Sequence, residues 1–99
     1  MSRDHEAEIT WPAARVEQGL PTFHRTIDPA WFWDDAPKTT EGWSLVCEFG
    51  APPERQGNPT RARVHFMMDA APHDRLREGV LLRMFEPGSR QYATVRILD

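Results

Sequence analysis

The sequence has one cysteine, no long hydrophobic run and only a small excess of negative charge. The single cysteine, Cys47, cannot form an internal disulfide, and the four histidines lack the short spacings of a zinc site. No apolar stretch is long enough for a signal peptide or a membrane span. The net charge of −3 differs from the strongly basic profile of a nucleic-acid-binding domain. We therefore expect a soluble, cytoplasmic protein without a metal, a cofactor or a membrane anchor.

The composition is that of an ordinary globular domain. Hydrophobic residues make up 39% of the 99 residues and charged residues 27%, which is enough apolar material for one core. We expect a single domain over residues 1–99, with residues 1–5 as a flexible N-terminus. Four tryptophans are many for this length, and each contributes about 1.5 to 3 kcal/mol when fully buried.

Three segments alternate between apolar and polar residues with the two-residue period of a half-buried strand. They span residues 6–11, 43–49 and 61–68. The residues expected to face inward are Ala7, Ile9 and Trp11, then Trp43, Leu45, Cys47 and Phe49, then Ala62, Val64, Phe66 and Met68.

The segments between these strands are rich in turn residues. Gly19 and Pro21 limit residues 13–20 to a loop with at most one helical turn. Residues 22–33 contain a proline among aromatic residues, which favours two short strands over one regular strand. Residues 34–42 are expected to form a solvated acidic loop, residues 50–60 a connection without an element, and residues 73–78 a single helical turn.

The last twenty residues are typical of a β-hairpin. Residues 79–86 and 91–98 form its two arms, and Pro87 and Gly88 supply the turn. One face of the hairpin carries Val80, Leu82 and Met84 from the first arm and Ala93, Val95 and Ile97 from the second. The whole pattern predicts an all-β protein, a single small antiparallel β-barrel of about six strands or a sandwich.

With these strands in place, the chain resembles the C-terminal β-barrel domain of elongation factor Tu and small stand-alone proteins similar to it. In that family a Gly-Tyr-Arg-Pro-Gln-Phe signature stands where this chain has Thr26-Ile27-Asp28-Pro29 followed by Trp31 and Phe32. The other segments that carry the resemblance are residues 6–10, Gly19 with residues 21–23, residues 63–66, residues 76–79 and the ending 80–98.

The resemblance implies a six-stranded antiparallel barrel used as a docking module. Ile27 and Asp28 replace the tyrosine and the arginine of the signature, whereas Pro29 and Phe32 keep the residue type. The sequence has no P-loop, so GTP binding and hydrolysis do not follow from the resemblance.

No pattern in the chain favours an enzyme. The strand pattern points Cys47 inward, away from the exposed, electropositive setting that a thiol nucleophile needs. Asp34, Asp35 and Glu41 are candidates for a general acid–base pair, but adjacent carboxylates beside Pro37 are typical of a solvated turn. We therefore expect no catalytic residues. A small enzyme or ligand-binding barrel stays as a third hypothesis, and a solidly packed interior would contradict it.

Arginines concentrate in the second half of the chain, while most acidic residues lie in the first half. This pattern favours a solvated outer face, and its functional alternative is a nucleic-acid or ribonucleoprotein-binding surface that includes His65 and Tyr92. The arginines of this set are Arg61, Arg63, Arg75, Arg77, Arg83, Arg90 and Arg96.

The leading hypothesis is a non-enzymatic barrel that binds another protein, or a second copy of itself as a homodimer. Protein interfaces favour Trp, Tyr and Arg, and this chain is rich in tryptophan and arginine. The expected contact regions are the aromatic-rich first third and residues 50–60. The candidate partner-binding residues are Trp31, Phe32, Trp33, Arg61, Arg63 and Arg83.

Overall fold

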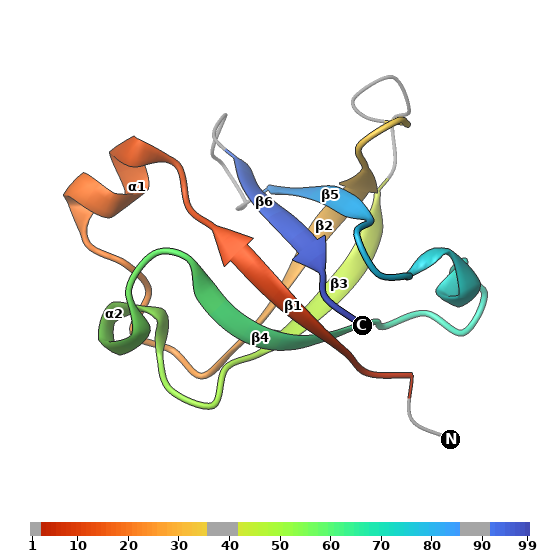
Figure 1. The fold of residues 1–99 in the computed structure, drawn as a ribbon, viewed down its shortest axis with the longest axis horizontal. Coiled ribbons are helices and arrows are strands. Elements are labelled where there is room, and N and C mark those ends of the chain that lie inside the picture. Colours follow the sequence, from red (N-terminus) through yellow and green to blue (C-terminus); the bar gives the residue numbers. More distant parts are fainter. Residues whose placement is uncertain (1–2, 36–41, 86–91) are drawn as a thin grey trace.

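The computed structural model describes residues 3–35, 42–85 and 92–99, which form a closed barrel of six antiparallel strands (Figure 1). The spatial order of the strands is β1-β4-β3-β2-β5-β6, and β6 pairs with β1 to close the barrel. This architecture confirms the predicted all-β fold and its strand number. The strands are β1 (His5–Thr10), β2 (Arg25–Phe32), β3 (Trp43–Glu48), β4 (Thr60–Phe66), β5 (Leu81–Phe85) and β6 (Tyr92–Ile97).

The inward-facing residues of all six strands fill one hydrophobic core. The predicted alternation is confirmed along β1 and along the two arms of the last hairpin, whose turn at residues 87–90 lies outside the described residues. Among the large side chains of the core, Trp11, Phe66, Leu82 and Val95 are 3% exposed or less. The core therefore occupies the space that a ligand would need inside a barrel of this size.

One inward prediction is wrong at the end of a strand. Met68 is 51% exposed, because β4 ends at Phe66 and the side chain extends past the barrel. Trp43, the first residue of β3, is 36% exposed for the same reason, although its neighbour Leu45 is fully buried. Alternation thus gives the correct face but does not say where the barrel ends.

A single strand, β2, replaces the two short strands expected over residues 22–33. Pro29 lies within it, opposite Ser44 of β3. The Ser44 carbonyl accepts a hydrogen bond from the Met67 N–H of the neighbouring chain segment, so Pro29 and Ser44 form a non-hydrogen-bonded pair. The proline nitrogen therefore points away from β3 and toward β5. The pairing of β2 with β5 begins only at Ala30, so no residue of β5 is paired with Pro29. The missing N–H interrupts neither ladder.

Two of the connections contain short helices: α1 (Ala13–Gln18) is somewhat longer than the single helical turn allowed for residues 13–20, and α2 (Pro53–Gln56) lies in a connection that was expected to contain no element. Helix α1 follows Pro12 and ends at Gly19, which has a φ of 100°. Helix α2 lies within residues 50–60 and is fastened to β4: the Gln56 side chain accepts a hydrogen bond from the Arg61 N–H at 2.9 Å and donates to the Arg61 carbonyl at 3.0 Å. The predicted single turn near residue 73 is confirmed as the 3₁₀ helix η1 (His73–Arg75).

The barrel has two chemically different ends (Figure 1). Helices α1 and α2 lie at one end, which we call the helical end. At the other end lie residues 3–4 and 98–99, the residues that follow β2 and the segment from β4 to β5 that contains η1. We call this second end, formed by residues 3–4, 33–35, 67–80 and 98–99, the η1 end.

Candidate docking surface

Large apolar side chains are exposed around the η1 end. Trp33 and Trp43 are 37% and 36% exposed, Met67 and Met68 are 50% and 51% exposed, and Trp31 is half-buried beside them. We call these five residues the Trp–Met surface. Exposed groups of large apolar side chains mark interaction sites more often than isolated ones do, and aromatic residues and methionine are enriched in interfaces.

Strand pairing and packing bring Trp31, Trp43 and Met67 of the Trp–Met surface close together. The Met67 N–H donates to the Ser44 carbonyl at 3.0 Å, which extends the β3–β4 register by one pair and places Met67 opposite the residue that follows Trp43. The Trp31 indole packs on Gly42, the residue before Trp43, where a Cβ atom would lie 2.9 Å from the indole ring. The surface therefore runs across three neighbouring strands.

An aromatic cluster in the core supports this surface from below. The ring centroids of Trp43 and Phe66 are 6.5 Å apart, and those of Phe66 and Phe32 are 5.8 Å apart. The Arg75 guanidinium lies 3.8 Å from the centre of the Phe32 ring and forms an ion pair with Asp35 at 2.8 Å. Contacts of this kind fix the backbone under the exposed side chains, which reduces the entropy that a partner must offset on binding.

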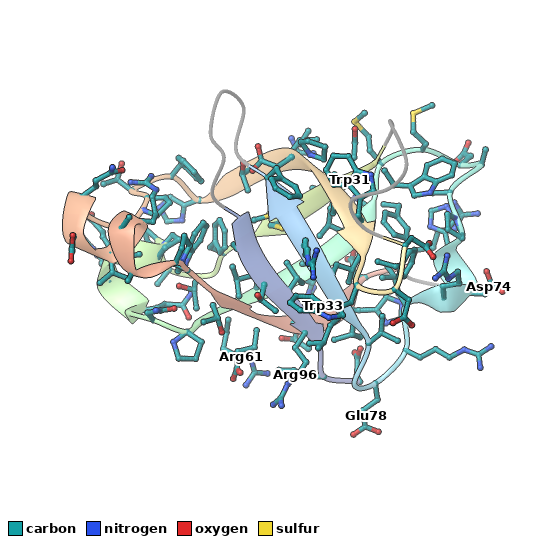
Figure 2. The ribbon with its side chains drawn as sticks, turned by 90° about the horizontal axis from the view of Figure 1, so that it is seen from above. Trp31, Trp33, Arg61, Asp74, Glu78 and Arg96 are labelled. Atoms are coloured by element: carbon teal, nitrogen blue, oxygen red, sulfur yellow. The ribbon has the colours of Figure 1, made fainter. Side chains whose placement is uncertain are left out.

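The structure brings three of the six predicted partner-binding residues together and separates the others. Trp31 and Trp33 lie on the outer surface at the end of β2, as Figure 2 shows, and Arg83 stands opposite Trp31 in the β2–β5 register. The Arg83 guanidinium is 4.0 Å from the centre of the Trp33 ring. Phe32 points inward and is 4% exposed, so it packs in the core and is not part of the surface.

Arg61 and Arg63 lie on a different side of the barrel, on β4. Both contact the Glu6 carboxylate, at 3.6 and 3.7 Å, and Arg96 of β6 lies 3.9 Å from Glu8. Figure 2 shows Arg61 and Arg96 on the opposite side of the barrel from Trp31. Each of these arginine charges therefore has an acidic partner on the neighbouring strand.

Sequence reasoning missed Trp43, Met67 and Met68 as candidate partner-binding residues. The available signal is the pair of consecutive methionines, because alternation forces one of two adjacent strand residues to face outward. A large apolar residue in an outward position is unusual for a strand whose other outward residues are Arg61, Arg63 and His65.

A groove of about 470 Å³ adjoins the Trp–Met surface at Trp33. Asp34 and Asp74 contribute carboxylates to it, and the described part of the chain offers neither of them a hydrogen bond or an ion pair. The groove is lined by Phe32, Trp33, Asp34, Asp74, Arg75, Arg77, Gly79, Val80 and Leu81.

A second groove of about 500 Å³ lies beside α2, in the region of residues 50–60 that we expected to contact a partner. Its charged lining consists of the Glu6, Arg61 and Arg63 group together with Glu48. Glu6 is shared by Arg61 and Arg63, Glu48 lies 4.0 Å from Arg25, and the Gln56 side chain is occupied by backbone groups. The second groove is therefore a weaker candidate for binding than the groove at the η1 end.

The candidate catalytic groups that the structure describes lie in different settings. Cys47 is fully buried, and burial, together with the charge of Asp28, raises the pKa of its thiol far above the ordinary value of 9.0. Asp35 is engaged by Arg75, and Glu41 lies outside the described residues. Within residues 3–35, 42–85 and 92–99, no three His, Cys, Asp or Glu side chains are grouped for metal binding. The helices in these same ranges are too short and polar to cross a membrane.

Comparison with protein-family models, with curated proteins and with solved structures found no match to this chain. The six-stranded antiparallel barrel is therefore established by the structure alone, and the resemblance to the C-terminal domain of elongation factor Tu stays a prediction.

Proposed function

We propose that this chain is a non-enzymatic docking barrel, related in its use to the elongation-factor barrel that it resembles, and that it binds another protein through the Trp–Met surface. The observation that carries the proposal is the exposure of Trp33, Trp43, Met67 and Met68 at one end of a barrel whose interior is filled. Burying a large apolar side chain contributes about 1.5 to 3 kcal/mol, so a partner that covers several of them gains substantial affinity.

A nucleic-acid-binding arginine face is the second function considered, and the structure offers it less support. Phosphate binding needs cations whose charge is available. Glu6 accompanies Arg61 and Arg63, Glu8 accompanies Arg96, and Arg75 is held by Asp35. The exposed tryptophans, Trp33 and Trp43, which would provide stacking surfaces for bases, lie around the η1 end and not beside Arg61 and Arg63. Phe23, at the helical end, is the other exposed aromatic residue in the described part of the chain, at 42%.

Site-specific photocrosslinking tests the docking function by capturing whatever protein covers the surface. A photoreactive phenylalanine analogue replaces Met68 on the Trp–Met surface, and in a second protein it replaces Arg55, an exposed residue of α2 at the helical end. Both proteins are irradiated in lysate of the source cells after circular dichroism has shown that they are folded. We expect a discrete crosslinked protein from position 68 and none from position 55.

A competition experiment identifies the surface that binds the crosslinked protein. An excess of unlabelled wild-type protein should suppress the crosslink at position 68, whereas an excess of the folded double variant Trp43→Ala/Met67→Ser should not. Equal crosslinking from positions 68 and 55, or no crosslinking from position 68, would contradict the docking proposal. RNA recovered with the protein in place of a protein partner would favour the arginine-face alternative.

A further inference from the structure

The charges of the barrel are distributed unevenly between its two ends. The segments that form the η1 end carry seven acidic residues and three arginines in the described part of the chain. The segments at the helical end, residues 11–24 and 49–59, carry two acidic residues and two arginines. The charged residues of the η1 end are Arg3, Asp4, Asp34, Asp35, Asp69, Asp74, Arg75, Arg77, Glu78 and Asp99.

Several of the acidic side chains at the η1 end have no partner among the residues that the structure describes. Asp34, Asp74 and Glu78 are exposed, and no hydrogen bond or ion pair reaches their carboxylates from the described residues. Figure 2 shows Asp74 and Glu78 pointing outward from the barrel. Asp34 and Asp74 line the groove that contains Trp33 and thus place negative charge beside the Trp–Met surface, whereas Figure 2 shows Glu78 on the side of Arg96, away from Trp31.

The cations of this end are largely engaged. Arg75 is bound to Asp35 at 2.8 Å and stacks on Phe32, and Arg3 lies 3.3 Å from Asp69. Arg77 lines the groove, and its Nε donates to the Asp74 carbonyl at 3.0 Å. The groove therefore presents two free carboxylates against one guanidinium that has no acidic partner in the described ranges.

We infer that the occupant of the Trp–Met surface is a basic amphipathic segment of a partner protein, one that presents apolar side chains flanked by lysine or arginine; this inference rests on the docking function proposed above. Its apolar side chains cover Trp43, Met67 and Met68. A basic side chain enters the adjoining groove, its aliphatic stem against Leu81 and Val80 and its charge near Asp34 and Asp74. Methionine side chains are flexible and adapt to apolar groups of different shapes.

Charge complementarity favours a basic segment over the other possible occupants of the Trp–Met surface. An acidic segment, a nucleic acid or an anionic membrane would bring negative charge to an end that already has an excess of it. A second copy of this chain would place one acidic end against another, so a homodimer through this surface is disfavoured by the same repulsion. A basic segment is attracted to the surface, and the attraction also accelerates its association.

Selection from an unbiased library tests the charge class directly. Short peptides of random sequence, displayed on phage, are selected for binding to the intact wild-type protein. We expect the enriched peptides to be rich in Lys and Arg interspersed with Leu, Phe or Trp. Enriched peptides that are neutral or acidic on average, or a selection without enrichment, would overturn the inference.

Binding of one enriched peptide to matched variants then locates the site. Asp34→Asn/Asp74→Asn removes two charges from the groove, and Glu17→Gln/Glu54→Gln removes two charges from the helical end. The first variant should bind the labelled peptide about fivefold more weakly in fluorescence anisotropy, which corresponds to two exposed ion pairs. The control variant should bind it nearly as well as the wild type does. An equal loss in both variants would contradict the assignment to this groove.

The outcomes separate this inference from the docking proposal. A protein that crosslinks at position 68 while the selection yields acidic peptides would leave the docking function standing and exclude a basic partner. Sedimentation of the wild type as a dimer that Met67→Ser/Met68→Ser converts to a monomer would assign the surface to a second copy and overturn the inference.

Discussion

Gly42 supports the Trp31 indole, and no larger residue fits at this position. A Cβ atom there would lie 2.8 Å from the Ala30 carbonyl oxygen and 2.9 Å from the Trp31 ring. We expect Gly42→Ala to lower the free energy of unfolding by about 1 to 3 kcal/mol, the usual cost of overpacking, and to displace Trp31. Urea denaturation followed by tryptophan fluorescence measures both effects. Gly50→Ala is the control, because a Cβ there meets no atom within 4 Å, and equal losses in the two variants would contradict the explanation.

Cys47 is a weak acid that the fold keeps protonated. Desolvation is the main cause and the charge of Asp28 the second, and both raise the pKa of the thiol above its ordinary value of 9.0. The thiol of the unfolded chain ionises near that value, so unfolding releases a proton at alkaline pH. The corresponding contribution to stability is complete below the unfolded pKa and is lost as the pH rises above it, by up to about 1.4 kcal/mol per pH unit.

Comparison with Cys47→Ala isolates this contribution from other groups that titrate at alkaline pH. Urea denaturation at several pH values between about 8 and about 10.5 gives the free energy of unfolding of both proteins. The variant is expected to be less stable at neutral pH because it leaves a small cavity, and its stability should fall less steeply with pH. Parallel pH profiles would show that the Cys47 thiol ionises as readily in the folded protein as in the unfolded chain.

At the scale of elements, the two-residue alternation of apolar and polar residues identifies strands well but predicts poorly where they end. Alternation gave the correct inward face for Leu45 and Cys47 of β3, although Val46, on the opposite face between them, is also buried at 1% exposure. The same alternation placed Met68 inside the barrel. Whether an inward position is covered depends on where the neighbouring strands end, and that is a property of the closed sheet.

The other differences between the predicted and the observed elements also arise from contacts that form only in the folded chain. The presence of Pro29 predicted a break in the strand. β2 nevertheless continues through Pro29, because the proline nitrogen faces the side of the strand that is unpaired at this position. Helix α2 is fastened by Gln56 to the backbone of Arg61, a contact that only the folded connection creates. Of the candidate site, the sequence predicted Trp31, Trp33 and Arg83, whereas the additional methionines come from the position at which β4 leaves the sheet.

At the scale of the whole molecule, folding changes the meaning of the arginine-rich second half. Glu6 and Glu8 of β1 stand between β4 and β6, so the arginines of both strands meet carboxylates from the first half of the chain. The side chains of these pairs are 32% to 63% exposed, and each pair therefore contributes at most about 1 kcal/mol to stability. Their main consequence is that two glutamates offset most of the charge of three arginines on this side, whereas Asp34, Asp74 and Glu78 of the η1 end have no such partner among the described residues.

Removal of the two glutamates tests whether they suppress nucleic-acid binding by this side. The wild type should retain a single-stranded RNA weakly in filter binding even at about 50 mM salt, whereas Glu6→Gln/Glu8→Gln frees Arg61, Arg63 and Arg96 and should bind it more tightly, with an affinity that falls steeply toward about 200 mM salt. Glu17→Gln/Glu54→Gln changes the net charge by the same amount at the helical end and should have a smaller effect. Tight, salt-dependent binding of RNA by the wild type would mean that paired arginines remain available to phosphate, and the arginine face would then replace the Trp–Met surface as the preferred functional site.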